Sequence, residues 1–259
     1  MPQPFSPETA ARYIFDSHAA HTAYQNLPPE IAPATVEQAY TAQEALAQLL
    51  IPREGEVAGL KIAVATKVMQ ELMGIDHPCG GMIFARRIHA SPATLRLADY
   101  IHVVVEFELA VRLGRDLPKL SAPWTADSVK PAIEALMPAY ELIEDRHAVY
   151  RETNALSMIA DNCWNAGIVL GTPVVYDQRS LAGIAGHLKA NGRETHRGAT
   201  DDPLATLAWI ANLAADRGRP MTAGMVVITG SVIPTLPIAA GETFEFSLDG
   251  VGGVEIRAA

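Results

Sequence analysis

The sequence predicts an α+β fold in which a mixed β-sheet curls into a roll or barrel behind an N-terminal helical region. The first 50 residues contain two helical patterns, whereas the apolar runs after them are mostly short and β-rich. These strand-like runs do not alternate regularly with single helices, as they would in a doubly wound sheet. The chain also returns to strands near its end, where residues 242–257 are typical of a β-hairpin.

Two helices are expected at the start of the chain. Ser6 is suited to cap a helix over residues 6–24, with Pro7 at its first position. The proline-rich segment LPPEIAPA ends this helix, and a second amphipathic pattern covers residues 34–50. The N-terminal region is therefore predicted to be helical throughout, apart from this break.

The sequence pattern changes from helical to strand-like after the second helix, and this change suggests one division of the chain. Residues 1–55 are expected to form the helical region and residues 56–259 the mixed β-roll, although the two can also be counted as a single domain. Within the second part, the expected strands lie near 57–66, 100–111, 137–145, 165–171 and 223–230, and the expected helices at 67–74, 126–136, 178–189 and 204–217.

Composition and charge exclude several classes of protein. With 49% hydrophobic and 19% charged residues, the 259-residue chain is typical of a globular protein. Its net charge of −9 offers no source of attraction to a phosphate backbone. Cys79 and Cys163 are too few for a disulfide framework, and no apolar run approaches the roughly 18 residues of a membrane helix. We therefore expect a cytoplasmic protein without nucleic-acid or membrane partners.

The run VVVEFELAV, residues 103–111, places two carboxylates in an otherwise apolar strand. Side chains alternate along a strand, so Glu106 and Glu108 share one face while the odd-numbered apolar residues share the other. One interpretation is the solvated face of an antiparallel sheet, which is a common pattern. The other is a metal site, because a divalent cation would relieve the repulsion between two carboxylates whose Cα atoms lie roughly 7 Å apart.

A third carboxylate is available from the strand-like run MPAYELIED. Oxygen ligands select hard cations such as Mg²⁺, Mn²⁺ or Ca²⁺ over zinc, and a third carboxylate would complete one side of an octahedron. Glu141 is the candidate, because alternation groups its competitor Glu144 with the apolar face. The residues alone leave the solvated interpretation open and make Glu106, Glu108 and Glu141 the candidate ligand set.

Lys61 is the single charge in the strand-like run VAGLKIAVAT, and it shares a face with small residues. It could extend from a strand edge into solvent. Alternatively, it could lie beside a bound anion or move a proton, where burial beside a metal would lower its pKa. The run by itself does not decide between the two.

Several ordered blocks of the chain can be compared with a known family. They are AYTAQEAL, GLKIAVATKVMQELMGIDHPCGGMIF, VVVEFELAVRLGRDLP, MPAYELIEDR, IADNCWNAGIVLG and AGMVVITGSVIPTLPIAAGETFEFSLDGVGGVEIR. In this order the blocks resemble the 2-keto-4-pentenoate hydratase and 4-oxalocrotonate decarboxylase family of the fumarylacetoacetate hydrolase superfamily. The resemblance covers nearly the whole chain.

This resemblance implies a roll of mixed strands around a metal site and a Mg²⁺- or Mn²⁺-dependent lyase that acts on short 2-oxo acids. It maps the metal ligands onto the three glutamates named above and the family's active-site lysine onto Lys61. It also places Thr229 and Ser231 on a loop that lines the substrate pocket. It suggests that Asp161 borders that pocket, and the alternative is that Asp161 simply forms a turn before the next strand.

The chain departs from the family's pattern close to the lysine. Family members resemble each other around a P-D-F-G segment whose aspartate faces the substrate, whereas HPCGG places Cys79 at the aspartate position. Asp76, in the neighbouring loop, is the residue that could compensate as a catalytic group. The family's G-L-T-S becomes AVAT, so that Thr66 stands at a position expected to contact substrate.

The expected activity is that of a hydratase, which adds water to a 2-hydroxy-2,4-dienoate of the 2-keto-4-pentenoate type and gives a 4-hydroxy-2-oxo acid. Decarboxylation of a 4-oxalocrotonate and C–C hydrolysis of an acylpyruvate remain open, as does a non-catalytic member that binds an oxo acid. The expected partners are a small 2-oxo acid, further copies of the chain in a homo-oligomer, and a possible enzyme complex of a catabolic pathway.

Overall fold

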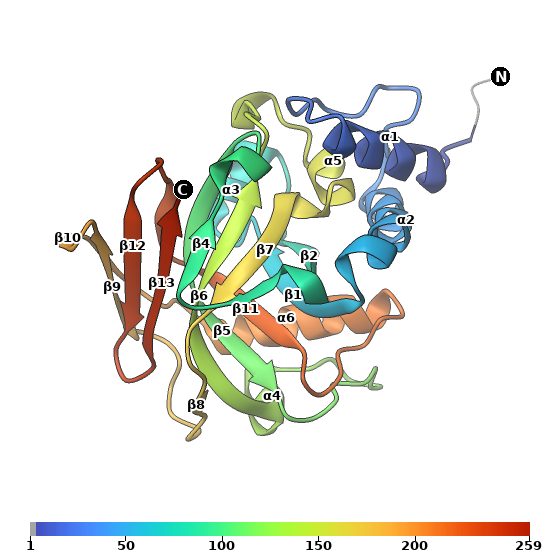
Figure 1. The fold of residues 1–259 in the computed structure, drawn as a ribbon. Helices are drawn as coiled ribbons and strands as arrows, with labels where there is room; N and C mark the ends of the chain where they lie inside the picture. The colour runs from blue at the N-terminus through green and yellow to red at the C-terminus, as the bar shows by residue number, and fades with distance from the viewer. Residues whose placement is uncertain (1–3) are drawn as a thin grey trace.

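The chain forms two β-sheets flanked by helices in the computed structural model, which describes residues 4–259 (Figure 1). The larger sheet has eight strands. Their order is β2 (Cys79–Phe84), β1 (Val57–Ala63), β11 (Val226–Pro237), β5 (Val103–Leu113), β6 (Ile133–Glu144), β7 (Asn165–Leu170) and β3 (Ile88–Ala90), and β8 (Val174–Val175) pairs with β6.

The larger sheet is mixed and curled. The pairs β1–β11 and β3–β7 are parallel, whereas β11–β5, β5–β6 and β6–β7 are antiparallel. Strands β2 and β7 contact each other although four strands separate them in the order of the sheet. The expected α+β fold with a curled mixed sheet is therefore confirmed.

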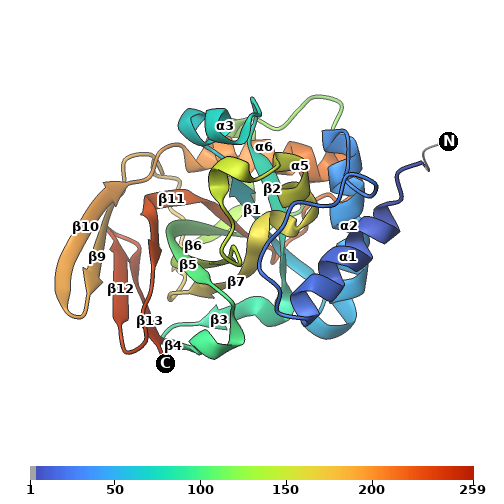
Figure 2. The same ribbon diagram turned by 90° about the horizontal axis from the view of Figure 1, so that it is seen from above.

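The smaller sheet packs against one face of the larger one (Figures 1 and 2). Its order is β10 (Arg193–Ala199), β9 (Ala185–Ala190), β12 (Thr243–Leu248), β13 (Gly252–Ala258) and β4 (Ala93–Leu95). Strands β12 and β13 are the hairpin expected near the end of the chain. Aromatic side chains fill the space between the sheets: the rings of Phe107 and Tyr140 lie 5.6 Å apart, and Phe107 lies 5.8 Å from Phe244 and 5.6 Å from Phe246.

The helices cover the remaining faces. Helices α1 (Pro7–Ala19) and α2 (Val36–Glu54) pack on each other and lie near α5 (Ala155–Ala160), while α6 (Pro203–Asp216) contacts β1 and β11 (Figure 1). The buried amide of Gln43 ties α2 to its surroundings, because it donates to the carbonyl oxygens of Gly80 at 3.0 Å and Ile159 at 2.8 Å. The expected division at residue 55 coincides with the end of α2, and it stays a prediction.

Two expected helices are wrong. Only α4 (Ala126–Val129) and a 3-10 turn form in the first of these segments, 126–136, because Pro131 cannot continue a helix and β6 begins directly afterwards. The second segment, 178–189, contains no helix and ends in β9. Gly186 explains this difference, since a Cβ atom there would lie 2.7 Å from Val232, so the backbone must pack closely against the larger sheet.

Other elements agree with the sequence or were missed. Helix α3 (Lys67–Met73) and α6 lie where they are expected. The HPCGG segment, in contrast, leads straight into the fully buried strand β2, which the glycines made hard to anticipate. Among residues 4–259, no helix is long and apolar enough to cross a membrane.

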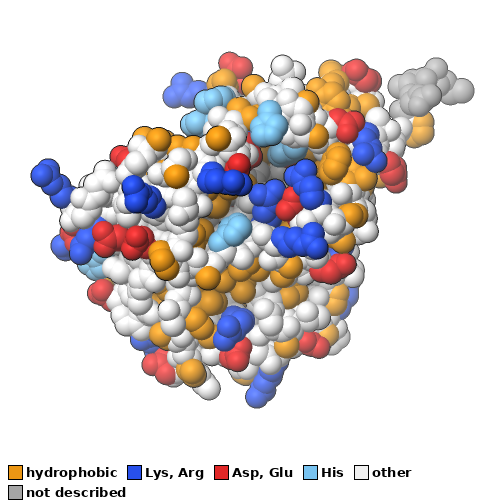
Figure 3. All heavy atoms as spheres, viewed as in Figure 1, with side chains coloured by type: hydrophobic (Ala, Val, Ile, Leu, Met, Phe, Trp, Pro, Cys, Tyr) orange, Lys and Arg blue, Asp and Glu red, His pale blue; other side chains and the backbone are white. Residues whose placement is uncertain are grey.

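The molecular surface carries both signs of charge. Lys and Arg side chains gather near the middle of the face shown in Figure 3, although the net charge is −9. Neighbouring charges pair: Arg87, for example, donates two hydrogen bonds to Glu54 at 2.7 and 2.9 Å. The positive charge on this face is therefore a local feature of an acidic protein.

Tyr140 provides a test of how the two sheets are joined. Its hydroxyl lies within hydrogen-bond distance of the carbonyl oxygens of Phe244 (2.8 Å) and Val254 (3.1 Å), on the two strands of the C-terminal hairpin. We expect Tyr140→Phe to lower the free energy of unfolding by about 1–3 kcal/mol, because it leaves buried carbonyls without a donor. Urea denaturation measures this change. Tyr13→Phe, at a side chain that is 36% exposed, is the control and should change it by less than about 0.5 kcal/mol.

Candidate functional site

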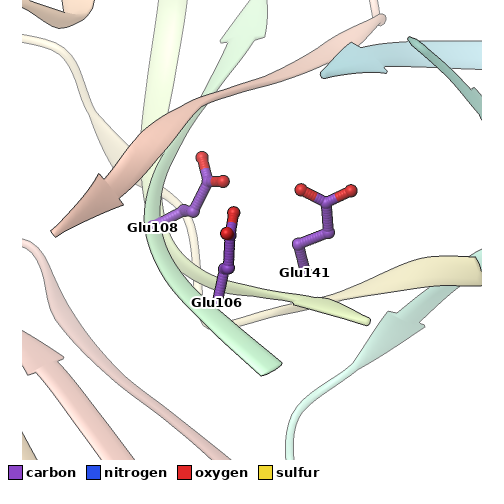
Figure 4. Close-up of side chains that lie close together, drawn as sticks. All are labelled: Glu106, Glu108 and Glu141. Carbon is purple, nitrogen blue, oxygen red and sulfur yellow. The ribbon is translucent and has the colours of Figure 1, made fainter. Parts of the chain in front are cut away.

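Strand pairing brings three glutamates together inside the curled sheet. Strands β5 and β6 are antiparallel, and Glu106 stands directly opposite Glu141 in their register. Glu108 lies two residues further along β5 on the same face. Figure 4 shows that all three carboxylates point into the same space.

The three carboxylates have the geometry of a cation site. One oxygen from each of Glu106, Glu108 and Glu141 lies within 4.8 Å of the others. Glu108 and Glu141 are fully buried, and Glu106 is partly exposed. The interpretation of the Glu106 and Glu108 face as solvated is therefore wrong for Glu108, whereas Glu106 keeps partial exposure.

Hydrogen bonds fix one oxygen of each carboxylate. The hydroxyl of Thr235 donates to Oε1 of Glu106 at 2.7 Å. The backbone N–H of Gly230 donates to Oε2 of Glu108 at 2.6 Å. The amide of Asn165 donates to Oε1 of Glu141 at 2.9 Å, and the ammonium of Lys61 lies 3.0 Å from the same oxygen.

The remaining oxygens show that a cation fits this site. Oε1 of Glu108 and Oε2 of Glu141 are buried and have no hydrogen-bond partner within the described chain. Buried polar atoms are almost always paired, so two orphan carboxylate oxygens in one cluster call for a ligand. An all-oxygen donor set suits hard divalent cations such as Mg²⁺ or Mn²⁺.

Without a cation the carboxylates are strained electrostatically. Burial, followed by the charges of Glu141 and Glu106, raises the pKa of Glu108 well above its ordinary value. Burial also raises the pKa of Glu141 to about 7, although Lys61 opposes this shift. Without a cation the site therefore favours the neutral, protonated forms of these two carboxyl groups.

Lys61 is buried inside the sheet, with 2% of its surface exposed, and does not extend into solvent. Gly81 of β2 makes room for it, since a Cβ atom there would lie 3.0 Å from the lysine Cγ. Burial by itself lowers the pKa of Lys61, but the neighbouring Glu141 carboxylate raises it above its ordinary value. A lowered pKa was expected for Lys61 beside a bound metal, and that expectation stays a prediction.

The expected loop residues Thr229 and Ser231 flank the amide that binds Glu108. Both of their hydroxyls bond to the backbone: Thr229 donates to Leu109 O at 2.8 Å, and Ser231 donates to Ile233 O at 2.6 Å. Ser231 also accepts a hydrogen bond from the N–H of Phe107 at 3.1 Å. The two side chains shape the loop around Glu108, and their contact with a substrate stays a prediction.

Four other predicted residues are not joined to the cluster by any hydrogen bond or ion pair between residues 4 and 259. Asp76 and Thr66 are exposed, and Thr66 caps α3 by accepting from the N–H of Met69. Cys79 is fully buried, and burial raises the pKa of its thiol. The buried Asp161 is occupied by an ion pair with Arg146 and by His18 at 2.6 Å. Their functional roles stay predictions.

Three groups that hold the carboxylates were missed by sequence reasoning: Asn165, the N–H of Gly230 and Thr235. Asn165 opens an expected strand, but its approach to Glu141 depends on how β7 pairs with β6. Gly230 and Thr235 lie where the register of β11 against β5 shifts repeatedly. Irregular register has no local sequence signal, so only the family resemblance, through Thr229 and Ser231, pointed to this loop.

Comparisons with known proteins give consistent relatives. The chain is 29% identical to 2-keto-4-pentenoate hydratase 1 of Dechloromonas aromatica over 96% of this chain and 95% of that protein. It is 30% identical to 2-oxo-hept-4-ene-1,7-dioate hydratase of Escherichia coli over 88% of each chain. A structure of 4-oxalocrotonate decarboxylase from Pseudomonas putida G7, complexed with magnesium and adipate, superposes with a TM-score of 0.89, at 22% identity, over 98% of this chain and 97% of that one.

The expected resemblance is therefore confirmed for both sequence and fold. The family described as fumarylacetoacetate (FAA) hydrolase C-terminal matches residues 73–258, well over half of the chain. The matched range contains all three glutamates of the cluster and the Gly230 loop, while Lys61 precedes it. The chain belongs to the fumarylacetoacetate hydrolase family.

Proposed function

We propose that this protein is a Mg²⁺- or Mn²⁺-dependent hydratase that adds water to a 2-hydroxy-2,4-dienoate and gives a 4-hydroxy-2-oxo acid. The observation that carries the proposal is the buried trio of Glu106, Glu108 and Glu141, with two orphan oxygens, beside a buried lysine. The hydratases among its relatives support the choice of reaction. A cytoplasmic homo-oligomer belongs to the same proposal.

The three glutamates would hold the cation through their free oxygens. When bound, a divalent cation supplies Lewis-acid stabilisation of negative charge on the C2 oxygen and carboxylate of a 2-oxo acid. The anchored oxygens keep the carboxylates in place, because Thr235, Gly230 and Asn165 hold them from the protein side. The ligand set is thus preorganised.

Lys61 supplies a fixed positive charge. Its ammonium is held beside Glu141 and keeps its proton, since the neighbouring carboxylate raises its pKa. Charge that develops on the substrate during enolisation would be stabilised by this cation in a site from which water is largely excluded. The first role of Lys61 is therefore to stabilise negative charge on the substrate. It can also donate its proton to the substrate once that negative charge has developed.

A second candidate is decarboxylation of a 4-oxalocrotonate. The buried thiol of Cys79 stands where the family has a substrate-facing aspartate, and a thiol whose pKa is raised by burial is a poor proton carrier. Decarboxylation needs no water nucleophile and depends less on such a group. This observation favours the decarboxylase over the acylpyruvate hydrolase as the alternative.

Metal binding can be tested by removing single charges. We expect Glu108→Gln and Glu141→Gln to weaken Mn²⁺ binding by at least about tenfold in calorimetry, because each removes a charged ligand. Glu134→Gln is the matched control on β6: this side chain is exposed and pairs with Arg112 instead. Full Mn²⁺ affinity in both cluster variants would falsify the assignment of the ligands.

The pH dependence of the metal-free protein follows from Glu141. Its pKa is raised from 4.5 to about 7, so the folded state binds more protons than the unfolded state between these values. The free energy of unfolding of the metal-free protein should therefore fall as pH rises through this window, apart from other titrating groups. Thermal unfolding in a chelator, compared between wild type and Glu141→Gln, isolates the effect.

Added Mn²⁺ should reverse this loss. At pH 8 the cation neutralises the carboxylates, so the melting temperature of the wild type should rise on addition of Mn²⁺. Glu108→Gln without metal should be more stable than the wild type by on the order of 1 kcal/mol, because burial and the neighbouring carboxylates disfavour the charged form of Glu108. A wild type that melts at the same temperature with and without Mn²⁺ at saturating concentration contradicts this prediction.

Activity separates the candidate reactions. With Mn²⁺, the protein should remove the ultraviolet absorbance of 2-hydroxypenta-2,4-dienoate without releasing CO₂. Lys61→Met should lower kcat by about 100-fold or more, because it removes the fixed cation. Release of CO₂ from 4-oxalocrotonate, or cleavage of an acylpyruvate, would instead support the decarboxylase or the hydrolase.

A further inference from the structure

A histidine and an aspartate lie on the same strand face as the glutamates. His102 directly precedes β5 and Asp145 directly follows β6. Alternation places His102 on the face of Glu106, and Asp145 on the face of Glu141. The register pairs Val103 with Glu144, so the two residues face each other at the end of the same two strands.

Asp145 is held by three donors. The ring nitrogen Nδ1 of His102 lies 2.6 Å from its Oδ1, and the backbone N–H of His147 donates to the same oxygen at 3.0 Å. The hydroxyl of Tyr150 donates to Oδ2 at 3.0 Å. Only 4% of Asp145 is exposed, so its carboxylate is fixed in both position and orientation.

The turn after Asp145 is conformationally unusual. Arg146 and His147 both adopt left-handed backbone conformations, with φ values of 50° and 63°, which cost energy in residues other than glycine. The turn aims the N–H of His147 at Asp145 and stacks the two imidazole rings 4.4 Å apart. The buried ion pair of Arg146 with Asp161 holds this conformation. Such strain accumulates at functional sites.

The pairing leaves one nitrogen of His102 available. A carboxylate only accepts, so Nδ1 carries the proton and the lone pair resides on Nε2. Nε2 has no hydrogen-bond or ion-pair partner among residues 4–259, and 34% of the His102 side chain is exposed. An imidazole oriented by a buried aspartate, with Nε2 free, is the arrangement of a general base.

We propose that His102, oriented by Asp145, is an acid–base residue of the reaction. It removes a proton from the attacking water, and later returns it, at the end of the substrate remote from the 2-oxo acid group. The assignment rests on the proposed hydratase function. His102 lies four positions before Glu106 along the strand, which corresponds to about 13 Å between Cα atoms. The two side chains and a five- or six-carbon acid together match that length, and Val104 and Ile143, which lie between them on this face, are buried in an apolar cluster with Trp164.

The electrostatic surroundings of Tyr150, which donates to Asp145, include the charge of Glu106. Burial and the adjacent Asp145, followed by the charge of Glu106, raise the pKa of Tyr150, so the field of Glu106 reaches the surroundings of Asp145. Tyr150 keeps its proton and remains a donor to Asp145. The short helix α3, next to Lys61 in sequence, packs against the turn that contains Tyr150.

The chemical step balances as an addition of water to a 2-oxo-3-enoate. Nε2 takes one proton from water while the water oxygen bonds to C4. The π electrons of C3=C4 move toward C2, which gives an enolate whose charge Lys61 stabilises. Protonation of that enolate at C3, with the proton returned from the imidazolium, restores the neutral ring and leaves OH on C4 and H on C3. No oxidant or further reactant is required.

The test separates water addition from enolisation. We expect His102→Gln to lower kcat for hydration about 10²- to 10⁴-fold, as for other general bases. Exchange of the C3 hydrogens of 2-oxopentanoate with deuterium oxide, followed by NMR, should persist, because the glutamates and Lys61 are intact. Mn²⁺ affinity by calorimetry and the melting temperature should match the wild type. His196→Gln, on the exposed β10, is the control with full activity.

Two further variants sharpen the assignment. Asp145→Asn should lower hydration while Mn²⁺ affinity stays unchanged, since it removes the acceptor that orients the ring. Added imidazole should restore part of the activity of His102→Ala and none of that of Lys61→Met, which a purely structural role for His102 would not produce.

The outcomes are distinguishable. If His102→Gln hydrates within about threefold of the wild type, the assignment of His102 is overturned and the hydratase proposal stands. Loss of deuterium exchange or of Mn²⁺ binding together with hydration also overturns it, because His102 would then support the whole site. A wild type that binds Mn²⁺ but hydrates no 2-hydroxy-2,4-dienoate overturns both proposals.

Discussion

Three carboxylates share one largely buried space, and their mutual repulsion is the constraint on which the rest of this structure depends. Two of them are fully buried, and burial together with their neighbours raises their pKa values. The surrounding strands oppose this cost with donors: an amide from β7, a backbone N–H and a hydroxyl from β11, and an ammonium from β1. The neighbouring strands of the curled sheet are thus organised around one concentration of negative charge.

The carboxylate cluster was accessible from sequence because it depends on a local rule. Alternation along β5 put Glu106 and Glu108 on one face, and the same rule preferred Glu141 to Glu144, whose side chain accepts from the N–H of Ile101 at 2.6 Å, away from the cluster. The fold class followed equally from runs of strand-like pattern. Alternation shows which side chains share a face of the strand, but it does not show whether that face is buried. The solvated interpretation therefore stayed open.

The features that were missed depend on contacts between distant segments. Asn165 reaches Glu141 only through the pairing of β7 with β6, and Thr235 reaches Glu106 only through the irregular register of β11. The helix expected at 178–189 failed for the same reason: Gly186 must approach Val232 closely, and no local pattern reports that approach. His102 and Asp145 lie 43 positions apart and meet only at the strand ends.

Strand β6 carries neighbouring residues with opposite surroundings. Tyr140 points into the aromatic layer between the sheets, and Glu141 points into the charged interior. A slip of one residue in the pairing of β6 would exchange them, burying a carboxylate among aromatic rings and leaving a phenol among the glutamates. A chain with the wrong register of β6 therefore cannot pack its hydrophobic core. Because the same register places Glu141 beside the other glutamates, the core and the carboxylate cluster form together when the chain folds.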